Sequence, residues 1–377
     1  MNHSLENLLL KPKRIWNTGK TGTSGILVVR IDALGDMIVT IPFLRELRKN
    51  YPQEKITLVC NDSVRNLVET VPYVDRVVTC GVLASGRHRF QRNWSRLTEL
   101  AEREFADEKF SLVILPSYQA KGIELTVASS VKAARLVAYR DGQILGTGKS
   151  YIDCPMHEVQ RYLQLLQAMK LQVADDCLEI FTTDSDREVV RQLFAEEGID
   201  NSKKKLVVCL STSARRRDWP AEWYAAVCHR LCSKYPLEIL IAGAGAAAAQ
   251  YAAVFCREFG GAHDFTNRTT IRQTAALMQR SDYHLGGDTG TVHLAAACHL
   301  KGVALYKDCV GQKFPVCGTP ADNFYPWQAD IKVLRPVRPL PGCEKGCTHD
   351  EPHCIKQITV DEVCCELEKI IAGDYVS

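Results

Sequence analysis

Short runs of apolar residues alternate with longer amphipathic stretches through the first half of the chain. Alternation of this kind is typical of a parallel β-sheet whose two faces are covered by helices. A helix expected at 36–49 follows the first apolar run, and a longer one at 157–171 closes this half. The apolar runs that we expect to form strands are residues 25–31, 56–60, 76–80, 111–116 and 135–139.

The same alternation restarts after a mixed, charged stretch, so the sequence predicts two successive α/β halves, each a Rossmann-like domain. A chain of 377 residues has the length of two ordinary domains. We divide it into an N-terminal arm at 1–24, a first domain at 25–178 and a second domain at 179–377. The second domain ends in a helix that packs back, with Thr359 and Glu362 as a capping box at its start.

Composition narrows the class of protein. A net charge of +3 argues against a dedicated nucleic-acid binder. The sequence has no run of about 18 apolar residues of the kind that a membrane-spanning helix needs. Its N-terminal apolar patch precedes the basic residues, which is the reverse of the order in a secretory signal. We expect a cytoplasmic protein, attached at most peripherally to the inner membrane, whose 16 cysteines are mainly reduced thiols.

The segment RIDALGDMIVTIP, residues 30–42, is the first candidate site. It joins the first strand to a helix at the carboxyl edge of the sheet, where open α/β folds bind ligands. We expect Gly35 to give this turn a positive φ and Asp36 to stand at or near the helix N-terminus. The alternative is that Asp36 is only an N-cap residue. The segment lacks the three glycines of a dinucleotide fingerprint.

The segment GGDTGTVHLAAA, residues 286–297, is the second candidate site. It follows a strand-like run and opens a helix of small residues, so backbone N–H groups and hydroxyls converge where a phosphate can bind. The alternative is an ordinary capped helix after a tight turn. The residues that we expect to bind a phosphate-bearing ligand here are Asp288, Thr289, Gly290, Thr291 and His293.

Two arginine-rich segments complete the candidates for anion binding. In STSARRRDWP, residues 211–220, Thr212 and Ser213 leave a strand end and three arginines follow, which suit bidentate phosphate binding. The segment GRHRFQRNWSR, residues 86–96, suits a phosphorylated or carboxylated acceptor. For each segment the alternative is a solvated charged loop. The candidate acceptor-binding residues are Arg87, Arg89, Arg92 and Lys121.

A thiol-rich segment, PGCEKGCTHDEPHC, occupies residues 341–354. Its spacing fits no standard zinc module, so free thiols are the favoured interpretation, and a structural metal site or a disulfide stays open. We therefore assign no metal and no cofactor to the chain. The residues concerned are Cys343, Cys347, His349, His353 and Cys354.

Three of these segments, in this order, resemble the ADP-heptose:lipopolysaccharide heptosyltransferase family, glycosyltransferase family 9. The first is RIDALGDMIVTIPFLRELRKNYP, the second is STSARRRDWPAEWYAAV and the third is GGDTGTVHLAAA. The resemblance extends from about Gly25 to Ile371. It implies the GT-B fold, in which two Rossmann-like domains flank an interdomain cleft. It also implies inverting, metal-independent transfer of a sugar from ADP-heptose to a lipopolysaccharide-type acceptor at the inner membrane surface.

The resemblance also implies roles for individual residues. Asp36 matches the catalytic aspartate of the family, and Thr212 and Ser213 match hydroxyl positions near the phosphates. Residues 288–291 match the group that holds the ribose and diphosphate of the donor, and His293 belongs to the same motif. By this comparison Asp36 and Arg217 are the catalytic candidates, and the others bind the donor.

Two departures from the family pattern leave alternatives open. Arg217 stands where the family often has a lysine. The run IAGAGAAAAQ lacks the acidic residue that helps to grip the nucleoside, where Gly245 or Ala246 stands, so the identity of the donor stays open. The alternatives are another nucleotide-sugar transferase or epimerase of GT-B fold, and a non-catalytic GT-B protein that binds a glycan or nucleotide. The acceptor, the linkage and the oligomeric state are not determined by the sequence.

Overall fold

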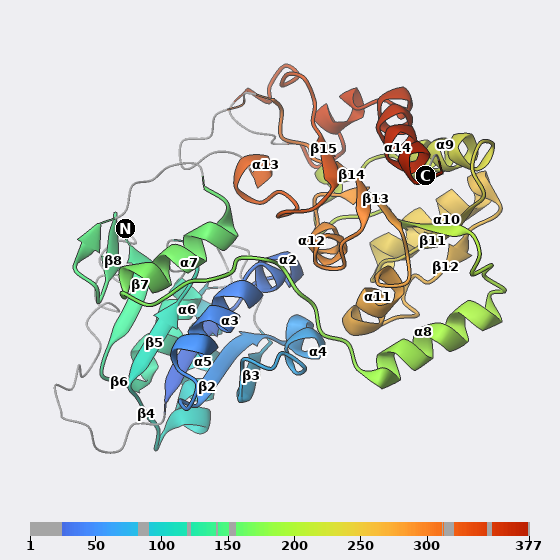
Figure 1. Cartoon of the computed structure of the whole chain (residues 1–377). Helices are drawn as coiled ribbons and strands as arrows, with labels where there is room; N and C mark the ends of the chain where they lie inside the picture. The colour runs from blue at the N-terminus through green and yellow to red at the C-terminus, as the bar shows by residue number, and fades with distance from the viewer. Residues whose placement is uncertain are drawn as a thin grey trace. The chain divides into compact units, whose positions relative to one another are not determined.

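The chain forms two compact units in a computed structural model, Met1–Cys177 and Leu178–Ser377 (Figure 1). Each unit has its own β-sheet and its own cluster of buried apolar side chains. The residues that the structure describes are 25–81, 90–118, 122–140, 142–150, 156–310, 312, 320–344 and 349–375.

The sheet of the first unit is mainly parallel. Its strands are β1 (Ile26–Arg30), β2 (Ile56–Asn61), β3 (Arg76–Cys80), β5 (Leu112–Leu115), β7 (Leu136–Arg140), β8 (Gln143–Leu145) and β9 (Lys149–Ser150). They lie in the order β3-β2-β1-β5-β7-β8-β9, and only the β7-β8 and β8-β9 pairs are antiparallel. Two further strands, β4 (Lys109–Phe110) and β6 (Lys132–Ala133), form a small separate sheet. The five strands expected from the apolar runs are thereby confirmed.

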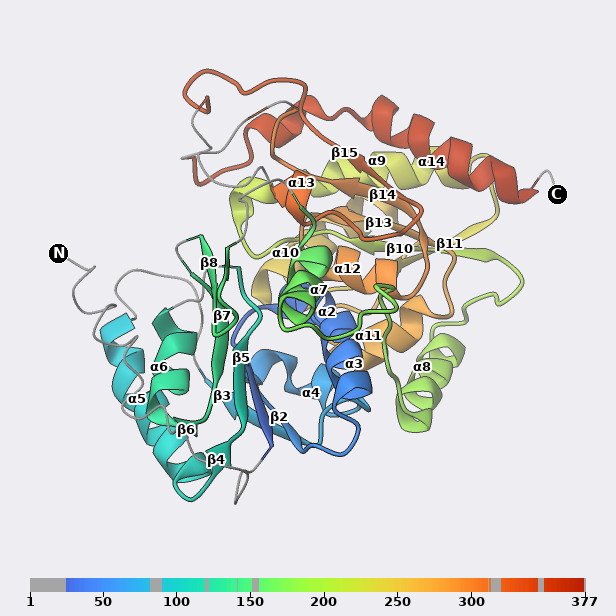
Figure 2. The same ribbon diagram turned by 60° about the vertical axis from the view of Figure 1, so that its left-hand side comes forward.

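Helices cover this sheet (Figures 1 and 2). Helix α3 packs against α7, and α5 packs against α6. Their apolar faces fill the core with side chains such as Leu44, Leu47 and Leu100, all at most 7% exposed. The helices are α2 (Leu34–Ile38), α3 (Ile41–Asn50), α4 (Arg65–Val68), α5 (Phe90–Phe105), α6 (Gly122–Ser130) and α7 (Glu158–Ala168), with a 3₁₀ turn η1 (Asp62–Val64).

The helix expected at 36–49 is wrong as a single element, because it is broken between α2 and α3. Pro42 lies in the first turn of α3. Proline has no N–H, and its ring clashes with the carbonyl four residues earlier, so a continuous helix cannot pass through this position. The hydroxyl of Thr40 donates to the Asp36 carbonyl at 2.6 Å, which supplies a donor at the break.

The second unit contains a parallel sheet in the order β12-β11-β10-β13-β14-β15. This arrangement, 3-2-1-4-5-6 in order of appearance, is that of a dinucleotide-binding Rossmann sheet. The strands are β10 (Lys204–Cys209), β11 (Leu237–Ile241), β12 (His263–Asp264), β13 (Tyr283–Gly287), β14 (Lys301–Leu305) and β15 (Ile331–Leu334). The helices are α8 (Asp184–Glu196), α9 (Ala221–Cys232), α10 (Ala246–Phe259), α11 (Ile271–Met278), α12 (Gly290–Ala297), α13 (Pro320–Asn323) and α14 (Val360–Tyr375), with 3₁₀ turns η2 (Arg215–Arg217) and η3 (Cys354–Gln357).

The C-terminal helix α14 lies along α9 of the second unit, as both ribbon views show (Figures 1 and 2). The capping box at its start is confirmed: the Glu362 carboxylate accepts from the Thr359 amide at 2.7 Å, and the Thr359 hydroxyl accepts from the Glu362 amide at 3.2 Å. The fully buried Trp219 donates from its indole Nε1 to the Ile358 carbonyl at 2.9 Å. This bond fixes the chain just before α14.

Each sheet has one point where the strand order reverses direction along the chain. In the first unit it lies between β1 and β5, and in the second between β10 and β13. Open α/β sheets bind ligands beyond the carboxyl ends of their strands at such points. Residues after β1 and after β10 are therefore placed where ligands bind.

Among the described residues, no helix is both long enough and apolar enough to cross a membrane.

Candidate active site

A buried arginine, Arg30, organises the carboxyl edge of the first sheet. It is the last residue of β1, and only 2% of it is exposed. Its Nη1 lies 2.7 Å from Asp32 Oδ2, and its Nη2 lies 2.9 Å from Asp36 Oδ1. Nη2 also donates to the Tyr162 hydroxyl at 2.6 Å, and Nη1 donates to the Ser117 hydroxyl. One guanidinium therefore links the loop after β1 to the loop after β5 and to α7.

More acidic groups surround this guanidinium. Glu124, fully buried in α6, lies 4.0 Å from Arg30 Nη1 and accepts a hydrogen bond from Ser117. Burial raises the pKa of Glu158, which also forms a hydrogen bond with Tyr162. Burial opposes the charge of Arg30, but its polar and acidic neighbours outweigh that effect and raise the Arg30 pKa well above its ordinary value. The arginine therefore stays charged.

The two aspartates that share Arg30 differ in their access to solvent. The side chain of Asp32 is 7% exposed, whereas that of Asp36 is 32% exposed. A general base must reach the hydroxyl of a substrate, and the Asp36 carboxylate has the open face that this requires. Its other face is held by Arg30, which favours the ionised form of a carboxylate in general.

Gly35 does not make the turn that the sequence led us to expect. It is a buried residue inside α2, and it is absent from the residues with positive φ. The helix begins at Leu34, two residues before the expected start at Asp36, with Ala33 as its N-cap in extended backbone conformation. Asp36 is thus the third residue of α2 and not its N-cap. A carboxylate in the first helical turn is still favoured by the partial positive charge of the helix N-terminus.

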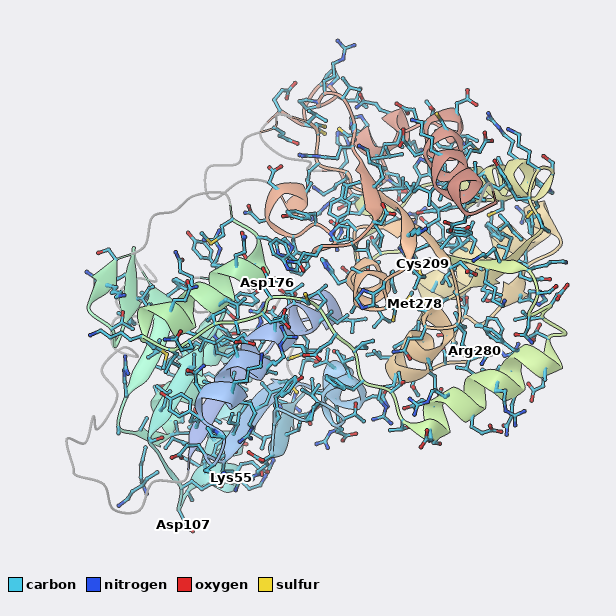
Figure 3. The ribbon with its side chains drawn as sticks, viewed as in Figure 1. Lys55, Asp107, Asp176, Cys209, Met278 and Arg280 are labelled. Carbon is cyan, nitrogen blue, oxygen red and sulfur yellow. The ribbon has the colours of Figure 1, made fainter. Side chains whose placement is uncertain are left out.

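The loop after β10 carries the second group of predicted residues. Its shape is set by its own polar groups: the buried Asp218 accepts from the Thr212 amide at 2.6 Å, and the Thr212 hydroxyl donates to the Ala214 carbonyl at 2.9 Å. Arg217 donates to the Ser213 hydroxyl from η2. Figure 3 labels Cys209, the residue that ends β10 just before this loop.

Arg217 also reaches the motif after β13. Its Nη1 lies 3.0 Å from Asp288 Oδ2, and the two side chains are 24% and 7% exposed. Burial raises the pKa of Asp288, and the charge of Arg217 acts in the opposite direction. A methyl-sized side chain at Gly287 would lie 2.8 Å from the Thr212 Cγ2 atom, so glycine is needed for the two loops to approach each other. The structure thus brings Thr212, Ser213, Arg217 and Asp288 together.

Helix α12 begins at Gly290, directly after these groups, with Thr289 as its N-cap. The first N–H groups of a helix have no acceptor within the helix, so they are available to an anion. The Thr291 hydroxyl oxygen is buried and makes no hydrogen bond among the described residues. Burial raises the pKa of the Cys209 thiol to about 12. His293 is fully buried, and its ring centroid lies 4.1 Å from that of Phe324. The ring therefore packs inside the second unit against Phe324.

Of the four predicted acceptor contacts, Arg87, Arg89 and Lys121 lie outside the described residues. Arg92 lies in α5, but its side chain is outside the described part of the structure.

Sequence reasoning found Asp36 but missed Arg30 and its partners Ser117, Glu124 and Tyr162. A signal was present, because an arginine ends an otherwise apolar buried strand and is followed by aspartates two and six residues later. A buried cation requires anionic partners, so this spacing already implied an ion-pair cluster. The participation of Tyr162 and Glu124 had no local signal, since they come from helices more than 90 residues away in sequence.

Comparison with known proteins agrees with this architecture. A family model described as glycosyltransferase family 9 (heptosyltransferase) matches residues 131–351. The lipopolysaccharide core heptosyltransferase OpsX of Haemophilus influenzae is 18% identical over 292 residues, which cover 74% of this chain and 78% of that protein.

Solved structures extend the match to almost the whole chain. The family 9 glycosyltransferase of Veillonella parvula superposes with a TM-score of 0.74 at 20% identity, over 95% of this chain and 100% of that one. Heptosyltransferase II of E. coli, an ADP-heptose lipopolysaccharide heptosyltransferase, superposes with a TM-score of 0.63 at 17% identity, over 93% and 99%.

Two Rossmann-like units, together with these structural neighbours, define the GT-B fold. The family match covers more than half of the chain, so the chain belongs to glycosyltransferase family 9, the heptosyltransferase family.

We predict that Arg30→Lys lowers transferase activity strongly. The ammonium of lysine is a compact point charge and cannot serve the acceptors that the fork of Arg30 reaches together. Each charge-assisted hydrogen bond that is lost costs about 1.5–3 kcal/mol of stability. The measurement is turnover beside the free energy of unfolding in urea.

The matched control is Arg45→Lys. Arg45 is also buried in the first unit, where it contacts Asp175 at 3.1 Å and the Cys177 carbonyl at 3.0 Å, away from Asp36. Both variants should lose stability, but only Arg30→Lys should lose most of its turnover. Equal losses of turnover at equal stability would show that Arg30 acts on the fold alone.

Proposed function

We propose that this protein is an inverting, metal-independent heptosyltransferase that moves a sugar from ADP-heptose to a lipopolysaccharide-type acceptor. The observation that carries the proposal is the partly exposed Asp36 carboxylate, which Arg30 holds at the ligand-binding edge of the first sheet. Family membership supports the reaction class. A solved structure of the E. coli heptosyltransferase WaaC with ADP-2-deoxy-2-fluoro heptose supports the assignment of ADP-heptose as the donor.

The reaction that we propose is one displacement at the anomeric carbon. Asp36 accepts the proton of the acceptor hydroxyl while that oxygen forms a bond to the anomeric carbon. The bond from this carbon to the phosphate oxygen breaks, and its electron pair leaves with ADP. Attack from the face opposite the leaving group inverts the configuration.

Departure of ADP places negative charge on a phosphate oxygen. Arg217 and the N-terminus of α12 supply the compensating positive charge in this mechanism. Thr212 and Ser213 bind phosphate oxygens, and the segment 288–291 holds the ribose and diphosphate. Since these groups occupy the place of the divalent ion in metal-dependent transferases, the transfer itself needs no metal.

The acceptor lies at the cytoplasmic face of the inner membrane in this proposal. Lipopolysaccharide-type acceptors carry negative charge, which suits the arginines of the 86–96 segment. The enzyme would therefore be a cytoplasmic protein that attaches peripherally to the membrane.

The experiment that tests the function is a donor screen on the purified chain. Release of the nucleoside diphosphate is measured with ADP-heptose, and with UDP- and GDP-sugars as controls, each in the presence of deacylated lipopolysaccharide core. We expect acceptor-dependent turnover of ADP-heptose. If only another nucleotide sugar is turned over, that sugar is the donor and ADP-heptose is not. If nucleotides bind and no sugar is turned over, the protein is a non-catalytic binder.

We predict that turnover persists in excess EDTA, because cationic side chains and a helix N-terminus stabilise the leaving group. The measurement is the initial rate before and after addition of EDTA at matched ionic strength. Complete loss of turnover that magnesium or manganese restores would contradict the mechanism.

We predict that Asp36→Asn lowers turnover by about 10²- to 10⁴-fold, the usual contribution of a general base, while donor affinity is kept. The amide has the shape of the carboxylate but cannot accept the proton. Asp32→Asn is the matched control, because it alters the other aspartate on Arg30, which is almost buried. It should reduce mainly stability. Normal turnover in Asp36→Asn together with loss in Asp32→Asn would reverse the assignment.

We predict that Arg217→Ala lowers turnover by an amount that corresponds to about 2–4 kcal/mol in the transition state, and that Arg217→Lys recovers part of it. Arg216→Ala is the control, since Arg216 is an exposed arginine of the same 3₁₀ turn. The Arg216→Ala variant removes one positive charge from the same turn and leaves the contact between Arg217 and Asp288 intact. If the Arg216 and Arg217 variants behave alike, the charge of the loop matters and the position of Arg217 does not.

A further inference from the structure

Three cysteines from two distant parts of the second unit form a buried cluster. Cys343 and Cys354 belong to the thiol-rich segment, and Cys309 comes from the loop after β14. Their exposed fractions are 1%, 4% and 1% in the order Cys343, Cys354 and Cys309. His353 adds an imidazole to the same place. No sequence pattern linked Cys309 to this group.

The distances within the cluster are those of metal ligands. His353 Nδ1 lies 3.3 Å from Cys343 Sγ and 3.8 Å from Cys354 Sγ. The three ligand atoms all lie within 4.8 Å of one another. Tetrahedral zinc, with Zn–S of about 2.3 Å and Zn–N of about 2.0–2.1 Å, requires its ligand atoms to be separated by roughly 3.5–3.8 Å. The side chains therefore already stand near the corners of such a tetrahedron.

Cys309 is available as the fourth ligand. It packs with Cys343 and Cys354 in the same buried cluster, so its side chain borders the three-residue group. Its Sγ is not one of the atoms that lie within 4.8 Å of one another, so its side chain must reorient to become the fourth ligand. Within the described part of the chain, no disulfide joins Cys309, Cys343 and Cys354.

Hydrogen bonds of the surrounding backbone hold the cluster in place. The amide of Leu340 donates to Cys354 Sγ at 3.5 Å, and the Cys343 amide donates to the Leu340 carbonyl at 2.9 Å. The side chain of Gln312 joins the two segments, because it accepts from the Cys309 amide at 3.3 Å and donates to the Cys343 carbonyl at 2.9 Å. N–H groups that donate to ligand atoms are a common outer shell of metal sites.

We propose that Cys309, Cys343, His353 and Cys354 form a tetrahedral site for one thiophilic transition-metal ion, either Zn²⁺ or Fe²⁺. Three sulfurs and one nitrogen are the ligand set that these ions share. The ion binds as the thiols release their protons, and no electron is transferred. Its role is structural, because none of the four ligands belongs to the groups assigned to the transfer.

The site ties together two segments that border the donor-binding edge of the second sheet. The loop of Cys309 starts from β14, the neighbour of β13. The segment of His353 carries Glu351, which lies 2.9 Å from Arg215 Nε in the same 3₁₀ turn as Arg217. Loss of the ion would therefore loosen the surroundings of Arg217 without removing any group that acts on the donor.

The test is elemental analysis of the full chain purified without chelator or affinity metal. We expect about one equivalent of zinc or iron per chain, as a single four-ligand site requires. The absorption edge of the bound element identifies which of the two ions it is. The double variant Cys343→Ser/Cys354→Ser should contain no bound zinc or iron. The control, Cys232→Ser combined with Cys365→Ser, alters two thiols outside the cluster and should retain it.

A second measurement keeps the proposal testable if the double variant fails to fold. Wild-type protein is titrated with p-hydroxymercuribenzoate in the presence of a chromogenic metal indicator. Release of one metal ion as the buried thiols react supports the site. Wild-type protein with only trace metal, retention of the metal in the folded Cys343→Ser/Cys354→Ser variant, or a disulfide among these cysteines by mass spectrometry would overturn it.

Discussion

The charge of one buried guanidinium decides how the first unit presents its ligand-binding edge. Arg30 ends the central strand β1 and is almost excluded from solvent, where an unpaired charge would cost several kcal/mol. Asp32, Asp36 and Glu124 compensate that charge, and Ser117 and Tyr162 accept further hydrogen bonds from its two Nη atoms. Because these partners come from four different segments, the loop after β1 cannot move without breaking the cluster.

Much of this architecture could be predicted from the sequence, because it depends on local patterns. Apolar runs identified the central strands, and the signals of Thr359 and Glu362 located the last helix. Pro42 was a signal for the break between α2 and α3, but the apolar periodicity on both sides of the break predicted one continuous helix. Gly35 misled for a related reason: a glycine can adopt positive φ, yet here it serves as a small buried residue inside α2.

Contacts between distant segments were beyond the reach of local patterns. Tyr162 meets Arg30 across 132 residues, and Arg217 meets Asp288 across 71. The thiol cluster shows the same limit. The spacing from Cys343 to Cys354 fits no standard metal module by itself, and the further thiol comes from Cys309, which stands more than 30 residues earlier. Cys309 reaches the thiol-rich segment only in the folded chain, through the loop that follows β14.

The two arginine–aspartate pairs suit different tasks because they differ in burial. In the pair of Arg30 with Asp36, the guanidinium is buried and the carboxylate is partly exposed. The group that a ligand can reach is therefore the carboxylate, which can accept a proton. In the pair of Arg217 with Asp288 the exposure is reversed: the carboxylate is 7% exposed and the guanidinium is 24% exposed. An open guanidinium is an anion site, and its buried carboxylate partner limits the cost of keeping it in place before the anion arrives. Burial also raises the pKa of Asp288, and the charge of Arg217 offsets part of that effect, so the carboxylate depends on its arginine partner. The same two residue types can therefore serve a proton acceptor in one unit and a phosphate-binding group in the other.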